Sequence, residues 1–351
     1  MAESSASFTI VHRDRHGEPD FVYPWDGNLA TCVVASINIC RGMLRNAKIR
    51  SAFVSFTREY NRSNPRAWYQ DPRYGYETTE DVVVTFINVI LASFPIVYID
   101  ESITSPGTLG GHPRRAWDHH FQPRDQSILL NGWRVRDMVA AATRAHRTND
   151  PSDNENKRFR TFIFLFANTF LHEIGHTLVT FLTKGRTSTP RHIRATIRGY
   201  SADGRGEAGR NLEEIIFGGT MEFYRDRADD DSQPGIPHTF TREGVRRISQ
   251  ESIDDTVRYY FHSPYHLEGR LRNSCEMEPL GHNYPQPVLT DPMEWIIMDT
   301  FKKLPECQKE SLVWRKEDPE GRGRETGRFL GLSFSRACEN LWENFSGSPN
   351  N

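Results

Sequence analysis

Two long apolar stretches stand out from an otherwise polar chain. The first covers residues 82–99 (VVVTFINVILASFPIVYI) and is interrupted by a few polar residues and one proline. A membrane span of that length would carry fewer polar groups and would not be broken near its end. The pattern instead predicts a helix from Thr79, its N-cap, to about Ser93, followed by a buried strand over residues 95–99.

The second apolar stretch covers residues 162–182 and has ionisable side chains at its centre. These are His172, Glu173 and His176, on a helix predicted over residues 159–183. Ionisable groups at that depth of a bilayer are costly, whereas the buried helix of a globular protein can satisfy them. We therefore predict a core helix here and no membrane span.

The other elements alternate between strands and helices and follow no fixed repeat. The patterns predict strands at 8–14 and 127–131, helices at 28–49, 134–146, 206–217 and 293–304, a turn at Asn131-Gly132, an irregular connection at 57–80 and a long loop at 102–126. Gly218-Gly219 is expected to end the helix at 206–217. This mixture predicts an α+β fold, with a central domain at 75–270, an N-terminal extension at 1–74 and a C-terminal extension at 271–351. That last part holds one clear helix and a disordered tail.

Composition excludes some functions. The 351 residues contain 44 Lys plus Arg and 46 Asp plus Glu, so a general coating of nucleic acid or anionic membrane is not expected. Five scattered cysteines without a C-x-x-C pair predict neither a disulfide framework nor a cysteine zinc site. The N-terminus lacks a basic segment followed by an apolar core, so we expect no signal peptide and a cytoplasmic protein.

The chemistry lies in the segment His172-Glu173-Ile174-Gly175-His176, which has the form H-E-x-x-H. Residues four apart lie on one face of a helix, so both histidines can direct a ring nitrogen at one ion. Imidazole suits Zn²⁺, and Glu173 lies close enough to contact a water on that ion without ligating it.

This motif resembles that of the zincin metallopeptidases. The longer metzincin form needs further Gly and His residues, and Val179 and Leu182 occupy two of those positions. The sequence Glu207-Ala208-x-x-Asn211 is similar to the E-A-x-x-D segment of the gluzincins, the thermolysin-like branch. The resemblance implies a zincin-like fold, Glu207 as third zinc ligand and Asn211 in place of the aspartate that supports a zinc-binding histidine. Glu214, seven residues after Glu207, remains an alternative ligand.

The resemblance also implies a mechanism, in which zinc activates a water and Glu173 serves as general base and then acid. A zincin uses a Tyr or His to stabilise the oxyanion; Tyr200 and His192 are the candidates here. Zincins lay their substrate along an edge strand before the active helix, and residues 127–131 occupy that place. His112, Asp118, His119 and His120 suggest a second metal site, but a solvated loop is the simpler interpretation.

The expected function is that of a zinc-dependent hydrolase, with peptides as the default substrate because the resemblance implies them. Two alternatives stay open. The same site can act on a small-molecule amide, ester or other carbonyl, since function follows the site and not the fold. The chain can also be a zinc-stabilised binding protein without turnover, although structural zinc would not need Glu173. Neither a nucleic acid nor a membrane is expected as a partner, and the sequence leaves the oligomeric state open.

Overall fold

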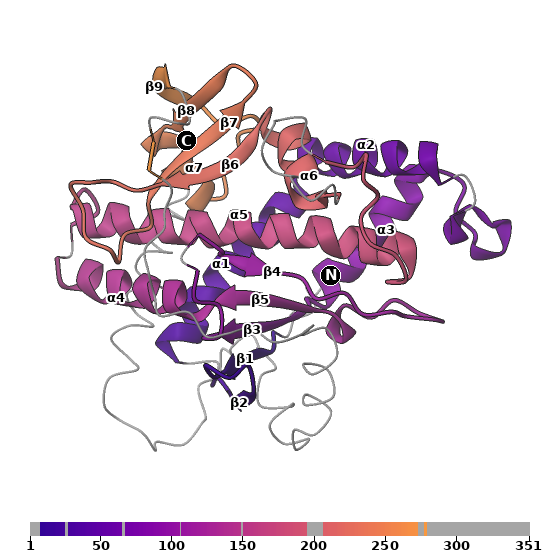
Figure 1. Cartoon of the computed structure of the whole chain (residues 1–351), viewed down its shortest axis with the longest axis horizontal. Coiled ribbons are helices and arrows are strands. Elements are labelled where there is room, and N and C mark those ends of the chain that lie inside the picture. Colours follow the sequence, from indigo (N-terminus) through magenta and orange to yellow (C-terminus); the bar gives the residue numbers. More distant parts are fainter. Residues whose placement is uncertain are drawn as a thin grey trace, which may run out of the picture.

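The structure is a computed structural model that describes residues 8–24, 27–64, 67–105, 107–148, 150–194, 206–272 and 277–278. It contains both helices and strands, which agrees with the predicted α+β class (Figure 1). The predicted helix at 293–304 lies outside the described residues, as does nearly all of the predicted C-terminal extension.

The first sheet has five strands in the order β2-β1-β3-β5-β4. These are β1 (Ile10–Arg13), β2 (Pro19–Val22), β3 (Ile96–Asp100), β4 (Gly110–Gly111) and β5 (Ser127–Asn131). The central strands β1, β3 and β5 run parallel, and β2 and β4 pair antiparallel at the two edges. Residues 127–131 form a strand, as predicted. The prediction that this strand lies at the edge of the sheet is wrong, because β4 pairs with the side of β5 that was expected to be open.

Helices pack on one side of this sheet. They are α1 (Asn28–Arg45), α2 (Ala47–Ser63), α3 (Thr79–Ala92), α4 (Gly132–Thr148) and α5 (Asn154–Thr183). The long helix α5 crosses the molecule between the first sheet and a second one, as Figure 1 shows. It packs against α1, α4, α6 and α7, so most of its surface is buried.

The second sheet is an antiparallel meander in the order β6-β7-β8-β9. Its strands are β6 (Thr220–Tyr224), β7 (Ile236–Thr241), β8 (Gly244–Ile248) and β9 (Leu267–Arg272). Two helices accompany it, α6 (Ala208–Phe217) before β6 and α7 (Gln250–Val257) before β9. As predicted, α6 ends at Gly218, which adopts the left-handed conformation at φ 76°.

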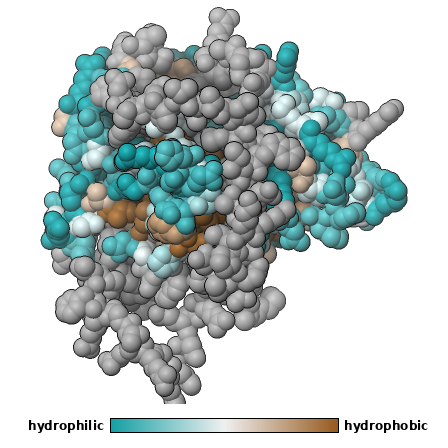
Figure 2. Space-filling model, turned by 60° about the horizontal axis from the view of Figure 1, so that its bottom comes forward, coloured by the Kyte–Doolittle hydropathy of each residue, from teal (hydrophilic) through white to brown (hydrophobic). Residues whose placement is uncertain are grey.

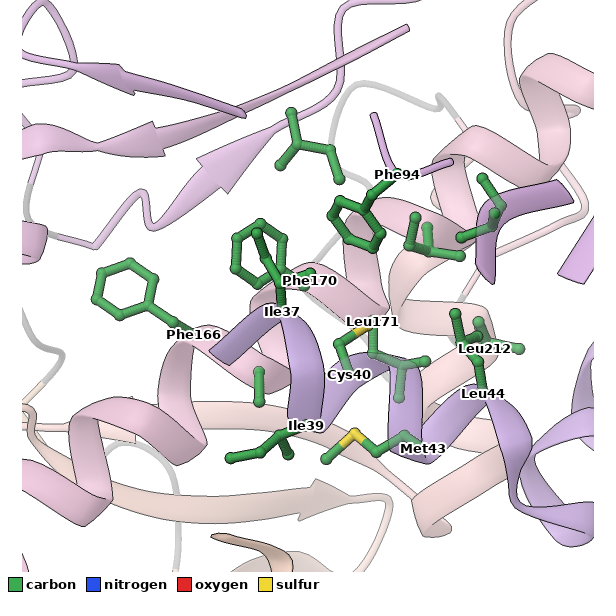
Figure 3. Close-up of a cluster of buried hydrophobic side chains, with 14 of the residues drawn as sticks. Ile37, Ile39, Cys40, Met43, Leu44, Phe94, Phe166, Phe170, Leu171 and Leu212 are labelled. Carbon is green, nitrogen blue, oxygen red and sulfur yellow. The ribbon is translucent and has the colours of Figure 1, made fainter. Parts of the chain in front are cut away.

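The main core lies where α1, α5 and α6 meet. Figure 3 shows Cys40 and Leu44 of α1 beside Phe170 and Leu171 of α5 and Leu212 of α6, all of them buried. Because α1 packs against α5, and β1 pairs with β3, residues before 75 belong to the same core as those after it. The predicted boundary at residue 75 therefore has no counterpart in the packing.

Among the described residues, α5 alone is long and apolar enough by length and composition to cross a membrane. In its most apolar window, 89% of the residues are buried inside the protein. That burial is typical of the core helix that the sequence predicts.

The first sheet is buried on both faces. Alternate strand residues Val11, Ile96, Tyr98 and Leu129 form a second, smaller hydrophobic cluster on the face opposite the main core. Figure 2, turned to bring the bottom of Figure 1 forward, shows hydrophobic side chains gathered between hydrophilic ones on this side of the molecule. Strands apolar on both faces are typical of the centre of a parallel sheet.

Several local predictions need correction. The helix predicted at 28–49 is two helices, because the Asn46 side chain accepts hydrogen bonds from the N–H groups of Lys48 and Ile49 and starts α2. Residues up to 63 are helical, so the irregular connection begins later than predicted. The N-cap of α3 is Thr78 and not Thr79. No turn separates β5 from α4, since Asn131 Oδ1 accepts from the N–H groups of the first helical turn.

Candidate metal centre

Helix α5 presents His172 and His176 on one face, with ring centroids 5.2 Å apart. The two rings face the N-terminal end of α6, and glycines allow the helices to approach there. A Cβ atom on Gly209 would lie 2.4 Å from the His172 ring, and one on Gly175 would lie 3.4 Å from Gly209 Cα. The close approach of α5 and α6 therefore depends on residues without side chains at this crossing.

Glu207 lies at the N-cap of α6 and turns its carboxylate to both histidines. Its backbone is extended, at φ −133° and ψ 96°, and Oε2 accepts a hydrogen bond from Arg210 N–H at 3.0 Å. Glu207 Oε1 lies 2.5 Å from His176 Nε2, and Oε2 lies 3.6 Å from His172 Nε2. One donor atom from each of these three residues falls within 4.8 Å of the other two.

His172 and Glu207 shift each other's pKa values. Burial lowers the pKa of His172, but the nearby carboxylates of Glu207 and Glu213 outweigh that effect and raise it to about 10. Burial likewise acts to raise the pKa of Glu207, while the two imidazoles hold it well below its usual range. The carboxylates thus create a site that favours positive charge.

Glu213 of α6 orients His172. Its Oε1 lies 2.7 Å from His172 Nδ1, and its Oε2 accepts a hydrogen bond from Met221 N–H at 3.0 Å. A carboxylate can only accept, so Nδ1 carries a proton, and Nε2 is the ring nitrogen that would give up its proton to a metal ion at the centre.

The prediction that Asn211 supports a histidine is wrong. Its Nδ2 donates to the carbonyl of Arg194 at 3.1 Å. The error arises because Glu207 precedes α6, so counting helical turns from Glu207 does not identify the face of α6 that points to the histidines. The role of Glu213 was not predicted. The sequence signal available for Glu213 is a second carboxylate near the middle of the ten-residue helix that Glu207 caps.

Glu173 lies beside this centre and lines a cleft of about 380 Å³. Its side chain is buried, and its Oε2 has no hydrogen-bond partner among the described residues. Burial raises the pKa of Glu173 above its usual value. The cleft is lined by α5 and α6, by residues 107–110, of which only Gly110 belongs to β4, and by residues 221–223 of β6.

The donor set fits Zn²⁺. Two imidazole nitrogens and one carboxylate leave a fourth tetrahedral position open, as catalytic zinc sites do. The buried, unpartnered oxygen of Glu173 would be satisfied by a water at that position. The fixed tautomer of His172 supports the same assignment.

The other predicted site residues do not join this cluster. Tyr200 lies outside the described residues. His192 contacts Ser63 Oγ at 2.7 Å and does not line the cleft. Glu214 does not contribute to the three-residue cluster, and no second cluster of this kind occurs in the described part of the chain, His112, Asp118, His119 and His120 included.

Comparison of the chain with models of known protein families, with characterised proteins and with solved structures found no match.

Proposed function

We propose that the protein is a zincin-like, zinc-dependent hydrolase that cleaves peptide bonds. The observation that carries the proposal is the combination of His172, His176 and Glu207 around one point with the buried, unpartnered carboxylate oxygen of Glu173 beside it. A purely structural zinc site needs ligands but has no use for a buried carboxyl at the edge of a cleft.

In this proposal three residues bind the metal and a fourth transfers protons. His172, His176 and Glu207 would hold Zn²⁺, which when bound lowers the pKa of a water and polarises a carbonyl. Glu173 then accepts the proton of the attacking water and passes it to the leaving amine. Glu213 keeps His172 in the required tautomer and orientation.

The strands that line the cleft favour a peptide as substrate. Its lining includes residues 107–110, which contain part of β4, and residues 221–223 of β6. Both strands lie at an edge of their sheets. Strand edges offer main-chain groups to an extended chain.

The decisive experiment separates metal binding from catalysis. The full-length protein is loaded with zinc, its metal content is measured, and a library of fluorescence-quenched decapeptides is screened for cleavage. We expect one equivalent of zinc, cleavage by the wild type, and a Glu173→Gln variant that keeps zinc but loses at least 100-fold in turnover. Retained cleavage in that variant, or zinc that survives His172→Ala and His176→Ala together, would overturn the proposal.

A further inference from the structure

The outer edge of β6 faces the cleft, and hydrogen bonds on either side of Phe223 fix which main-chain groups this edge presents. Met221 N–H donates to Glu213 Oε2 at 3.0 Å, away from β7, and Arg225 N–H donates to the carbonyl of Glu278 at 2.8 Å. Alternate residues of a strand direct their main-chain groups to the same side. Phe223, between these two residues, therefore directs its N–H and C=O to the outer edge as well.

The pairing of β6 with β7 supports this orientation. The residue opposite Phe223 is Pro237, which has no N–H to donate. A proline in an antiparallel pair fits only where the opposing residue turns its own main-chain groups away. The C=O of Met221 and the N–H and C=O of Phe223 are thus directed to the cleft side of the second sheet.

The opposite wall of the cleft carries the same kind of edge. Asn131 N–H donates to the carbonyl of Leu109 at 2.9 Å, so the next residue, Gly110, turns its main-chain groups away from β5. A Cβ atom on Gly110 would lie 3.6 Å from Glu173 Oε1, which places this edge beside the general base. Two sheet edges therefore border one cleft, and Glu173 lines it.

We propose that β6 is a second substrate-binding edge, and that an extended peptide lies between β6 and β4 and hydrogen-bonds to both. This inference rests on the proposed peptidase function and adds the way in which the peptide is held. The N–H groups of an extended peptide alternate in direction. A single strand edge would therefore hydrogen-bond to every second residue of the peptide, whereas two edges, one on each side, would hydrogen-bond to consecutive residues.

Glu213 gives this second edge a fixed position relative to the metal centre. The same carboxylate holds His172 through Oε1 and the Met221 N–H through Oε2. A peptide on β6 would therefore be held in register with the ligand that Glu213 orients. The Glu222 side chain, half-buried on the same strand, contacts Arg210, which lies near Glu207, and gives β6 a second link to α6.

An N-methyl scan tests the proposal. The probe is the quenched decapeptide that the wild-type protein cleaves fastest, synthesised with a single N-methyl group at each position in turn. Cleavage is measured as kcat/KM, and binding to zinc-loaded Glu173→Gln is measured by fluorescence anisotropy. We expect losses of roughly three- to tenfold or more at consecutive residues on both sides of the cleaved bond, because each lost hydrogen bond to the protein weakens binding.

A variant of β6 provides an independent measurement. Phe223→Pro removes the N–H directed at the cleft and leaves the bonds to β7 in place, while Phe223→Ala removes only the side chain. We expect kcat/KM to be at least threefold lower in Phe223→Pro than in Phe223→Ala, with equal zinc content. If N-methylation lowers kcat/KM only at alternate peptide positions, and the two variants have equal kcat/KM, then β6 does not bind the substrate. The proposed peptidase function would remain. A protein that cleaves no peptide of the library would overturn both.

Discussion

Glu213 lies 2.7 Å from Nδ1 of His172, on the side of the ring opposite the centre formed with His176 and Glu207. This contact fixes the tautomer of the imidazole and raises its basicity as a ligand. Glu213 lies six residues after Glu207, whereas the zincin resemblance indicates Asn211, four residues after Glu207, as the supporting residue. The candidate metal centre of this chain thus has its own supporting residue.

We expect Glu213→Gln to weaken zinc binding by about 10- to 100-fold, the usual effect of losing a partner that orients a ligand histidine. The matched control is Glu214→Gln on the same helix, which should bind zinc as the wild type does. Competition with a chromophoric chelator measures both affinities. Equal affinities of the two variants would remove Glu213 from the centre.

The difference between Glu213 and Asn211 shows where sequence analysis of the site reaches its limit. The histidines and Glu173 are set by spacing inside a long helix, so their common face is predictable. Glu207 is the N-cap of its helix, with extended backbone angles, and a rule based on helical turns fails across such a residue. The direction of Glu213 depends on where β6 places the Met221 N–H, which is a contact between separate elements.

The same limit applies to the fold. The apolar pattern predicts α3 and β5 nearly to the residue, and it predicts the end of α5 but places its start five residues late, at 159 in place of Asn154. Strand β4 is two glycines long and carries no pattern, because only its pairing with Leu129 and Leu130 makes it a strand. Missing it turned β5 into an edge strand in the prediction.

Gly209→Ala should damage the metal centre without changing any ligand. A Cβ atom at this position would lie 2.4 Å from the His172 ring, so either the ring or the end of α6 must move. Alanine stabilises a helix by about 1 kcal/mol relative to glycine, so the substitution should not weaken α6 itself. A loss of zinc affinity would therefore come from the clash with His172. We expect at least a tenfold weaker affinity by chelator competition, whereas Ile215→Ala on the exposed side of α6 should have no effect. Wild-type affinity in Gly209→Ala would show that the helices do not approach as described.

His112 should make stability depend on pH. Its Nδ1 donates to the carbonyl of Ser127 at 2.8 Å, and its Nε2 lies 2.9 Å from Thr180 Oγ1. Burial lowers the pKa of His112 to about 3. Between that value and about 6.5 the unfolded chain binds up to one more proton than the folded one, so this residue lowers stability as the pH falls, by up to about 1.4 kcal/mol per pH unit.

The measurement for His112 is urea unfolding at pH 7 and pH 5, compared with His112→Asn. Asparagine retains a donor for the Ser127 carbonyl but does not titrate in this range. We expect the wild type to lose more stability than the variant between these two pH values, and the difference to be absent between pH 7 and pH 8. An equal loss in both proteins would mean that His112 is protonated in the folded state as readily as in the unfolded one.

Gly110 and Gly111 form a matched pair for the β4 wall of the cleft. A Cβ atom on Gly110 would lie 2.9 Å from Thr169 Cγ2 and 3.6 Å from Glu173 Oε1, whereas one on Gly111 meets nothing within 4 Å. The Gly110 Cβ would also lie 2.9 Å from the carbonyl oxygen of Leu129, so Gly110→Ala should push β4 away from β5 and from α5, which carries Glu173, while Gly111→Ala leaves β4 in place. We expect peptide cleavage to fall at least tenfold in Gly110→Ala and to stay within about twofold of the wild type in Gly111→Ala. Zinc content should stay at one equivalent in both, because neither glycine contacts a ligand. Equal activity of the two variants would place the substrate away from β4 and leave β6 as the wall to examine.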